Sequence, residues 1–521
     1  MLVLPKKEML LIRAQHPGAI TTVIPQSKVI KYKGHPLVAV PHRVDEVKVL
    51  RNIGFQAPSP IHYYYGWPGR YKPFQAQKDT AAFLTVHRNA FVLNDLGTGK
   101  TMATLWAYDY LKQIGQVDKM LIVAPLSTLE RTWVDEIFMS FPHLNVSVLH
   151  GSRERRLKLL QQPADIYVIN HDGIKVSGLL DAFAQRDDIN LVIIDEVAQA
   201  ARNGATDRWK LLNKICNKQT SRRLWALTGK PTPNAPTDAW AQVKLVNPSN
   251  VPPYFGRFRD MVMRQVGPFT WLPRDDSPSV VHRALQPSIR FTRSECVGLP
   301  PCVHQTRTVE LSAEQRKAYK EMMTKLRAEV ESGEVRAVNE AVKVSKLLQI
   351  ACGVVYTDQG EAVIPAQPRL DLLEEIIDEA DTKVIIFVPF VSTVAAVAAF
   401  LSKRFSVETI HGGISKHDRD EIFRRFQLAT DPQVLVAQPA AMAHGLNLTA
   451  ASTIVWFSAI TSNEIYEQAN GRIVRPGQKY KQLIINIEGT PIERKLFDRL
   501  RHRQKLQGIL LELVNMDLQT A

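Results

Sequence analysis

Short apolar runs alternate with loop residues and helical patterns from about residue 70 onward. Five runs in the first half predict strands, at 90–94, 120–125, 166–170, 191–195 and 224–229. Five more predict strands in the second half, at 383–388, 407–412, 434–438, 453–458 and 482–487. Strands alternating with helices are typical of parallel βαβ units. The pattern therefore predicts an α/β protein with two similar parallel-sheet lobes.

The rest of the chain divides around these two sets of strands. Residues 1–70 are mixed in character and rich in proline, which predicts a small accessory domain or arm. Residues 71–247 form the predicted first lobe, and 376–521 the second lobe with a C-terminal helix. Between them, 248–375 begins with Pro, Arg and aromatic residues and continues as helical patterns, which predicts a largely helical insert.

One uncharged run, Val384 to Ser402, is long enough to resemble a membrane span. Pro389 divides it into a β-branched stretch and an Ala-rich stretch that begins near Ser392. Parallel strands buried on both faces have this near-continuous apolar character. The run is therefore interpreted as a strand, a loop and a helix, and no membrane association is predicted.

Composition changes this picture in two ways. The 521 residues carry a formal net charge of +15, an excess that favours a polyanionic partner such as nucleic acid. The 4 cysteines are too scattered for a disulfide framework, and no zinc-site spacing is present, which favours free thiols in a reducing cytoplasm. A chain of this length predicts two or three domains.

The stretch FVLNDLGTGKT, residues 91–101, places a strand, a Gly-rich turn and a helix start in succession. Gly97 and Gly99 would let backbone N–H groups approach phosphate oxygens, and Lys100 would reach the β- and γ-phosphates. The Thr101 hydroxyl would bind Mg²⁺. Asn94 occupies the position of the first Gly of the full phosphate-loop pattern, and a chance GKT in a loop is the alternative.

A second acidic motif follows the predicted strand 191–195. Asp195 and Glu196 end this apolar run, which is where a nucleotide-hydrolysing enzyme presents a metal ligand and a residue that orients the attacking water. Taken alone, an Asp-Glu pair at a strand end is equally consistent with surface acids. Its position 95 residues after Lys100 makes it the expected partner of the phosphate loop.

Several stretches together resemble one family, the Swi/Snf-like DNA translocases of helicase superfamily 2. They are LIVAPLSTLERTWVDEI (121–137), LTGKPTPNAPTDAW (227–240), HGGISKHDRDEIFRRF (411–426), HGLNLTAASTIVWF (444–457) and YEQANGRIVRPGQ (466–478). The resemblance covers about residues 70 to 510. It implies two RecA-like lobes, ATP and Mg²⁺ as cofactors, and DNA as the partner.

The resemblance also assigns roles to individual residues. Asp195 and Glu196 match the family's acidic motif, with Asp195 and Thr101 as the implied metal ligands. Arg472 and Arg475 match the arginines that reach the γ-phosphate across the lobe interface, so the implied catalytic residues are Lys100, Asp195, Glu196, Arg472 and Arg475. The implied nucleotide-binding and coupling residues are Gln77, Gly97, Thr98, Gly99, Lys100, Thr101, Gly445 and Gln468. Gln77 corresponds to the glutamine that reads adenine, and Gln75 is the alternative.

Three positions depart from the family pattern. Ala198 replaces a His that couples the acidic motif to the next motif, Lys230 replaces a Thr, and Ser458 stands where many members have Asp. None of these is a metal or phosphate ligand, so hydrolysis is expected to survive. The three departures bear instead on the coupling of hydrolysis to movement. Trp133 is interpreted as a core anchor in preference to a nucleic-acid contact.

These observations predict a DNA-dependent ATPase that moves along duplex or branched DNA through sequence-independent phosphate contacts. Fork reversal, branch migration and annealing are the activities that a compact member suggests. A motor that displaces proteins or recycles RNA polymerase is one alternative, and a non-catalytic nucleic-acid-binding module is another. A monomer in the cytoplasm of a bacterium or a phage-infected host is expected.

Overall fold

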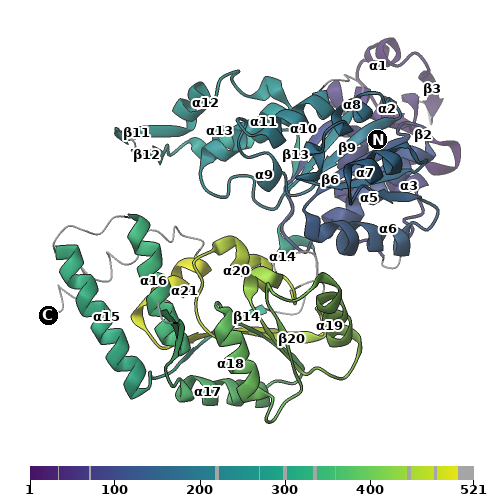
Figure 1. Cartoon of the computed structure of the whole chain (residues 1–521). Coiled ribbons are helices and arrows are strands. Elements are labelled where there is room, and N and C mark those ends of the chain that lie inside the picture. The colour runs from purple at the N-terminus through teal and green to yellow at the C-terminus, as the bar shows by residue number, and fades with distance from the viewer. Residues whose placement is uncertain are drawn as a thin grey trace. The chain divides into compact units, whose positions relative to one another are not determined.

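The computed structural model describes residues 1–502 except 33–34, 70–71, 218–221, 269, 297–301, 332–336, 358–359, 443–447 and 475–477. The chain divides into two compact units, Met1–Val297 and Gly298–Ala521 (Figure 1). Each unit contains its own parallel sheet, which confirms the predicted α/β class with two lobes.

The large sheet of the first unit has seven parallel strands in the order β13-β5-β10-β9-β6-β8-β7. In that order the strands are Ser288–Ile289, Asn89–Val92, Arg223–Leu227, Ile189–Ile194, Lys119–Ala124, Ile166–Asn170 and Val146–Val148. The helices are α4 (Gln75–Val86), α5 (Lys100–Gln113), α6 (Asp135–Ser140), α7 (Arg153–Gln161), α8 (Leu179–Ala184), α9 (Val197–Ala200), α10 (Asp207–Asn217), α11 (Ala239–Val246), α12 (Phe255–Val262), α13 (Ser277–Ala284) and α14 (Arg293–Cys296). All five strands predicted for this lobe are present, because their apolar runs are buried on both faces of the sheet.

The sheet of the second unit has six parallel strands in the order β14-β21-β20-β17-β19-β18. In that order they are Cys302–Thr308, Gln482–Glu488, Ala451–Trp456, Lys383–Phe387, Val434–Ala437 and Val407–Ile410. The helices are α15 (Ala313–Glu331), α16 (Ala337–Cys352), α17 (Gln367–Asp378), α18 (Val391–Leu401), α19 (Lys416–Leu428), α20 (Asn463–Asn470) and α21 (Pro491–Arg501), and a hairpin is formed by β15 (Val354–Thr357) and β16 (Gly360–Val363).

The uncharged run 384–402 forms β17 and α18, as its sequence predicts. Among the described residues, no helix combines the length and the hydropathy that crossing a membrane requires.

The segment 248–375 is shared between the two units. Its first part contributes α12, α13 and the antiparallel hairpin of β11 (Met263–Gly267) and β12 (Thr270–Pro273), all in the first unit. In Figure 1 this hairpin extends away from the large sheet. The same part also supplies the edge strand β13, which pairs with β5. The helices α15 and α16 belong to the second unit.

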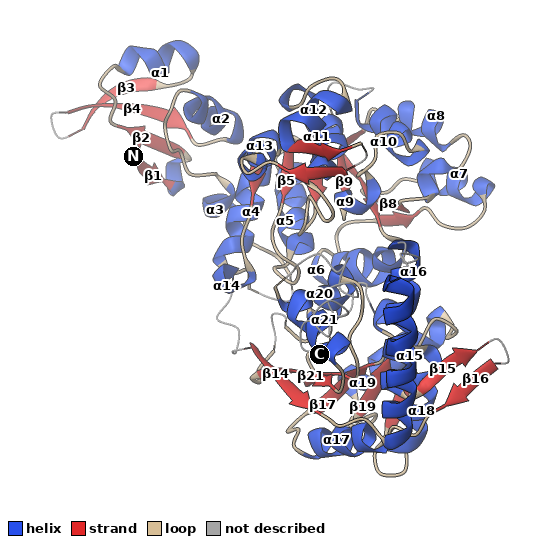
Figure 2. Cartoon of the chain, turned by 90° about the vertical axis from the view of Figure 1, so that its left-hand side faces the viewer, coloured by secondary structure: helices blue, strands red, loops and turns tan. Residues whose placement is uncertain are grey.

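The N-terminal residues form a small antiparallel sheet in the order β1-β2-β4-β3, separate from the large sheet (Figure 2). Its strands are Leu2–Leu4, Met9–Ile12, His35–Pro41 and Lys28–Tyr32 in that order, and its helices are α1 (Pro17–Val23) and α2 (Val44–Asn52), followed by α3 (Ile61–Tyr64). The strand β3 lies at one edge of this sheet, and Val29 within it is 53% exposed.

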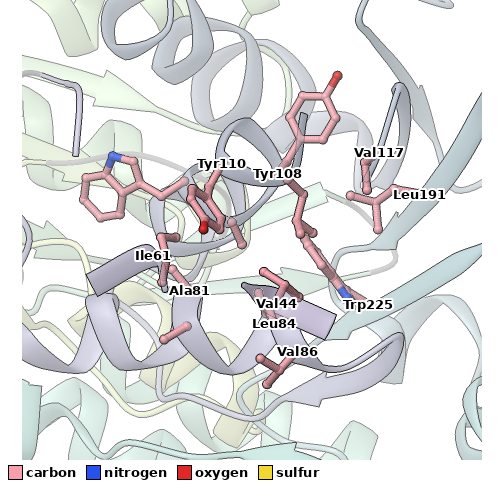
Figure 3. Close-up of a cluster of buried hydrophobic side chains, with 14 of the residues drawn as sticks. Val44, Ile61, Ala81, Leu84, Val86, Tyr108, Tyr110, Val117, Leu191 and Trp225 are labelled. Carbon is pink, nitrogen blue, oxygen red and sulfur yellow. The ribbon is translucent and has the colours of Figure 1, made fainter. Parts of the chain in front are cut away.

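The small sheet shares one hydrophobic core with the first lobe. Val44 and Val47 of α2 belong to the same buried cluster as Leu84 of α4 and Trp225 of β10 (Figure 3). A polar link runs beside this core, where Gln116 donates to Asp45 at 3.1 Å and receives a hydrogen bond from Arg223 at 2.9 Å. The N-terminal domain is therefore packed onto the lobe and is not a loosely tethered arm.

Replacing Val47 with Ala should lower the free energy of unfolding of the first unit by about 2 kcal/mol, because the missing methyl groups leave a cavity in the shared core. Chemical denaturation followed by tryptophan fluorescence measures this change. Val29→Ala, at an exposed position, is the matched control and should change stability by less than about 0.5 kcal/mol. Equal effects of the two variants would contradict the shared core.

Candidate nucleotide-hydrolysis site

The phosphate loop lies between β5 and α5, and its two glycines have backbone angles that other residues rarely adopt. Gly97 has φ of 81° and Gly99 has φ of 78°. A Cβ added to Gly99 would lie 2.0 Å from Nε2 of Gln77. Glycine is therefore required at position 99 by both conformation and space.

The proximity of Gln77 to Gly99 distinguishes the two candidate glutamines, Gln77 and Gln75. Gln77 is buried, and its Oε1 accepts a hydrogen bond from the Phe74 amide at 3.2 Å at the start of α4. Gln75 points elsewhere, because its Nε2 donates to Asp79 at 2.8 Å at an exposed position. The geometry therefore favours Gln77 as the glutamine that faces the nucleotide.

Lys100 begins α5 and folds back over the loop. Its Nζ donates to the backbone carbonyls of Asn94 at 2.9 Å and Asp95 at 3.2 Å. Thr98 is buried and donates to the same Asp95 carbonyl at 2.8 Å, while the half-buried Thr101 is the second residue of the helix. The ammonium group is thus held at the mouth of the loop, at the positive end of a helix, where anions are favoured.

Asn94 has a structural role at the position where the full phosphate-loop pattern has glycine. Its Nδ2 donates to Thr80 of α4 at 2.9 Å, and its Oδ1 accepts from the Phe291 amide at 3.0 Å. The Asp95 amide donates to the Phe291 carbonyl at 3.0 Å. The segment after β13 is therefore bonded directly to the residue that opens the loop.

The acidic pair lies at the end of β9. β10 separates β9 from β5 in the sheet, and the carboxyl ends of all three parallel strands face the same edge. Gly229 follows β10, and a Cβ added there would lie 3.6 Å from both Asn94 O and Leu96 N. The fold thus brings together the phosphate loop, the segment after β10 and the acidic pair, as the sequence predicts for residues of one lobe.

Asp195 is 8% exposed, and both of its carboxylate oxygens accept hydrogen bonds. Trp133 Nε1 donates to Oδ2 at 3.0 Å, and the Glu196 amide donates to Oδ1 at 3.0 Å. Burial raises the pKa of the Asp195 carboxyl, while the Trp133 hydrogen bond and the charge of Lys100 act in the opposite direction. Trp133 is fully buried, which confirms it as a core residue and adds a contact to the site.

Glu196 follows with a left-handed backbone, φ 48° and ψ 53°. Few residues other than glycine adopt this conformation, and strained backbone of this kind clusters at functional sites. Ala198, two residues later on α9, is buried at 6% exposed. A larger side chain there would have to displace its neighbours.

In the second unit, Arg472 follows α20 and is buried at 3% exposed. Its carbonyl accepts from the Leu448 amide at 3.1 Å. Gln468 lies on α20, and its Nε2 donates to Glu464 at 3.0 Å. Arg475 and Gly445 lie outside the described residues.

Two further buried residues, Gln478 and His171, make hydrogen bonds in these regions but were not among the residues predicted from the sequence. Gln478 is buried, and its Nε2 donates to the Ala451 carbonyl at 2.8 Å, which holds Gln478 at the start of β20. His171 is also buried and lies 2.9 Å, through its Nε2, from the Asp195 carbonyl. Neither bond has a local sequence signal, because the partners are distant in the chain.

The donor set suits a magnesium ion that is shared with a phosphate ligand. Among the described residues, no group of three or more His, Cys, Asp or Glu side chains is placed to hold a metal. Mg²⁺ commonly binds through one or two protein oxygens together with phosphates and water. Asp195 and Thr101 are the residues that fit this description.

Two family models match the chain. The SNF2-related domain matches residues 51–353, and the helicase conserved C-terminal domain matches residues 368–477. The first match alone covers more than half of the chain.

Curated proteins from a phage, a yeast and a bacterium are similar to this chain. A putative protein, p41, of Acyrthosiphon pisum secondary endosymbiont phage 1 is 26% identical over 80% of this chain and 93% of its own length. The ISWI chromatin-remodeling complex ATPase ISW1 of Saccharomyces cerevisiae is 23% identical over 85% of this chain and 41% of its own length. The putative ATP-dependent helicase/translocase YwqA of Bacillus subtilis is 24% identical over 82% of this chain and 47% of its own length. The chain thus spans nearly all of the phage protein and less than half of the other two.

Among solved structures, the Sulfolobus solfataricus SWI2/SNF2 ATPase core in complex with dsDNA is similar, with a TM-score of 0.42 and 22% identity. The match covers 84% of this chain and 92% of that one.

Proposed function

Because the chain belongs to the SNF2-related family of ATP-dependent helicases, we propose that it is a translocase that couples ATP hydrolysis to movement along duplex or branched DNA. The family makes it an ATPase of the helicase type. The observation that carries the proposal is the convergence of the Lys100 loop and the Asp195–Glu196 pair at one edge of the first sheet. Such a pair of motifs provides what phosphoryl transfer to water requires.

In this mechanism the backbone amides of 97–101 and the Lys100 ammonium bind the phosphates of ATP. On binding ATP, Lys100 exchanges its bonds to the Asn94 and Asp95 carbonyls for phosphate oxygens. Thr101 and Asp195 would hold Mg²⁺, which neutralises phosphate charge when bound. Glu196 orients the attacking water and accepts its proton.

DNA as the track is supported by charge. The whole chain carries +15, and residues 1–57 contain 9 Lys and Arg against 3 Asp and Glu. Basic surfaces bind the phosphate backbone without reading sequence. Translocation itself is supported by the relative YwqA, which is described as a putative ATP-dependent helicase/translocase.

Fork reversal, branch migration or annealing is the finer activity that we propose. Each of these activities requires movement along DNA through phosphate contacts, which the positive charge of the chain would favour. We also propose that it acts as a monomer in the cytoplasm of a bacterium or phage-infected cell.

ATPase activity measured with single-stranded, duplex, forked and four-way-junction DNA tests the proposal. Duplex-containing DNA should stimulate hydrolysis more than single strands do. Because the contacts are to phosphates, the apparent DNA affinity should fall at least about tenfold between 50 and 200 mM salt.

Lys100→Ala is the control and should abolish hydrolysis on every DNA. Equal stimulation by single strands and duplexes would refute a duplex track. Protein displacement without any preference for DNA structure would support the alternative motor.

A further inference from the structure

His171 lies at the end of β8, one strand beyond β6 from the acidic pair. Its backbone amide donates to the Ala124 carbonyl at the end of β6, at 3.0 Å. Its side chain is buried, 5% exposed, and points to the end of β9, where Nε2 lies 2.9 Å from the Asp195 carbonyl. The histidine therefore bridges three neighbouring strands at the catalytic edge of the sheet.

The bond that it makes is to the peptide group between Asp195 and Glu196. The carbonyl of this peptide accepts from His171, and its N–H donates to Oδ1 of Asp195 at 3.0 Å. Both ends of one peptide plane are thus held. The residue that follows the plane is Glu196, with its left-handed backbone.

The imidazole is suited to donate this bond. Since a carbonyl can only accept, Nε2 must carry the hydrogen. Burial is the main cause that lowers the pKa of His171 to about 4, against a weaker opposing effect of its bond to the Asp195 carbonyl, and Arg208 and Asp172 are the charged groups that face it. The ring is therefore neutral at neutral pH, and a neutral glutamine amide can replace its donor.

Asp172, the residue after His171, is linked through an arginine to the other end of the turn that follows β9. Asp172 binds Arg208 at 2.6 Å, and Arg208 also donates to the Gln199 carbonyl of α9 at 3.4 Å. The loop after β8 thus contacts Asp195 directly and is linked to Gln199 through Arg208 of α10.

We propose that His171 is a positioning residue for ATP hydrolysis, which fixes the Asp195–Glu196 peptide plane and thereby the direction of the Glu196 carboxylate. This inference rests on the proposed roles of Asp195 and Glu196. A histidine does contact the acidic motif of this chain, but it comes from β8 and not from position 198, where the family pattern has one and this chain has a buried Ala.

Loss of the donor should affect the chemical step more than nucleotide binding. Losing one neutral hydrogen bond changes the rate by about tenfold when the bond serves only to orient the reacting group. The phosphate loop makes none of the bonds just described, so the KM for ATP should stay within about twofold.

The experiment compares His171→Gln, His171→Asn and His171→Leu in the full-length protein. Glutamine places an amide N–H close to the position of Nε2, whereas the asparagine amide is one carbon shorter and leucine has no donor. We expect His171→Gln to retain at least about half of the kcat, and the other two to lose about tenfold, with KM unchanged in all three. Thermal melting of each variant reports folding.

If the His171→Asn and His171→Gln variants have equal kcat, or if KM rises as much as kcat falls, the positioning role is refuted. Because Gln and Asn are both polar, their comparison holds even if His171→Leu fails to fold. Glu196→Gln serves as the reference. If that variant retains full hydrolysis, the proposed role of Glu196 fails; if it is inactive while His171→Asn is fully active, only the present inference fails.

Discussion

Replacing Asp195 with Asn is expected to reduce ATP hydrolysis at least about 100-fold and to raise the melting temperature of the nucleotide-free, metal-free protein. Hydrolysis falls because the amide is a poor metal ligand. Stability rises because burial disfavours the carboxylate, as the raised pKa of Asp195 indicates.

The gain in stability should depend on pH. A carboxyl whose pKa is higher in the folded state than in the unfolded state destabilises the fold increasingly as pH rises above about 4. The difference between Asp195→Asn and the parent protein should therefore shrink as pH falls toward about 4. Melting curves in EDTA between pH 4.5 and 8 measure it.

Glu196→Gln is the matched control for both effects. It should also lose hydrolysis, but its side chain is only half-buried, so its melting temperature should stay close to that of the parent. A destabilised Asp195→Asn protein would show that the lost hydrogen bonds from Trp133 or the Glu196 amide outweigh the relief of burial.

Replacing Arg369 with Met should destabilise the second unit by about 3–5 kcal/mol. Arg369 and Glu493 form an ion pair at 2.8 Å, with side chains 1% and 0% exposed. Without the guanidinium, the carboxylate stays buried and keeps only neutral donors, including Ser458 Oγ at 2.6 Å and the Gly489 amide at 2.9 Å. A buried charge without its counter-charge is the origin of the large effect.

Denaturant titration of Arg369→Met, Glu493→Leu and the double variant tests this. The double variant should recover much of the loss, because no charge remains buried. If the double variant is as unstable as Arg369→Met, the packing of the long side chain matters more than the charge. Ser458→Ala is the mild control, with a loss of about 1 kcal/mol expected.

The buried Arg369–Glu493 ion pair accounts for the serine at position 458, which departs from the family pattern. Ser458, which stands where many members have Asp, donates to Glu493 and is itself fully buried. A second carboxylate at this position would face Glu493 in a dry core that has one guanidinium for both.

The central parallel strands of both lobes could be predicted because most of them are continuous apolar runs, which can be recognised without knowledge of their neighbours. The phosphate loop and the acidic pair could be predicted because their residues are close in sequence or end such runs. β13 could not, since it has two residues and forms only by pairing with β5, about 200 positions earlier. β14 resembles a polar segment, because it is an edge strand with mostly exposed side chains.

His171 and Asn94 illustrate what sequence reasoning misses within the site. Each acts through one or two hydrogen bonds to partners far along the chain, Asp195 for one and Phe291 for the other. Such bonds follow from the order of strands in the sheet, and residue type and spacing carry no record of that order. The packing of α2 onto the lobe could not be predicted for a similar reason, because its apolar face has the same pattern whether it closes a small domain or docks on a larger one.

The shared core of α2 with α4 and β10 makes the N-terminal sheet and the nucleotide-binding lobe one mechanical body. The lysines of β3 therefore belong to the same compact unit as the helix that carries Gln77. Removing residues 1–57 would take Val44 and Val47 out of the core to which Leu84 and Trp225 also belong, and is expected to expose apolar surface on the remaining lobe. A role of this sheet in DNA handling would therefore be tested by charge reversals on β3, at Lys28 and Lys31, and not by truncation.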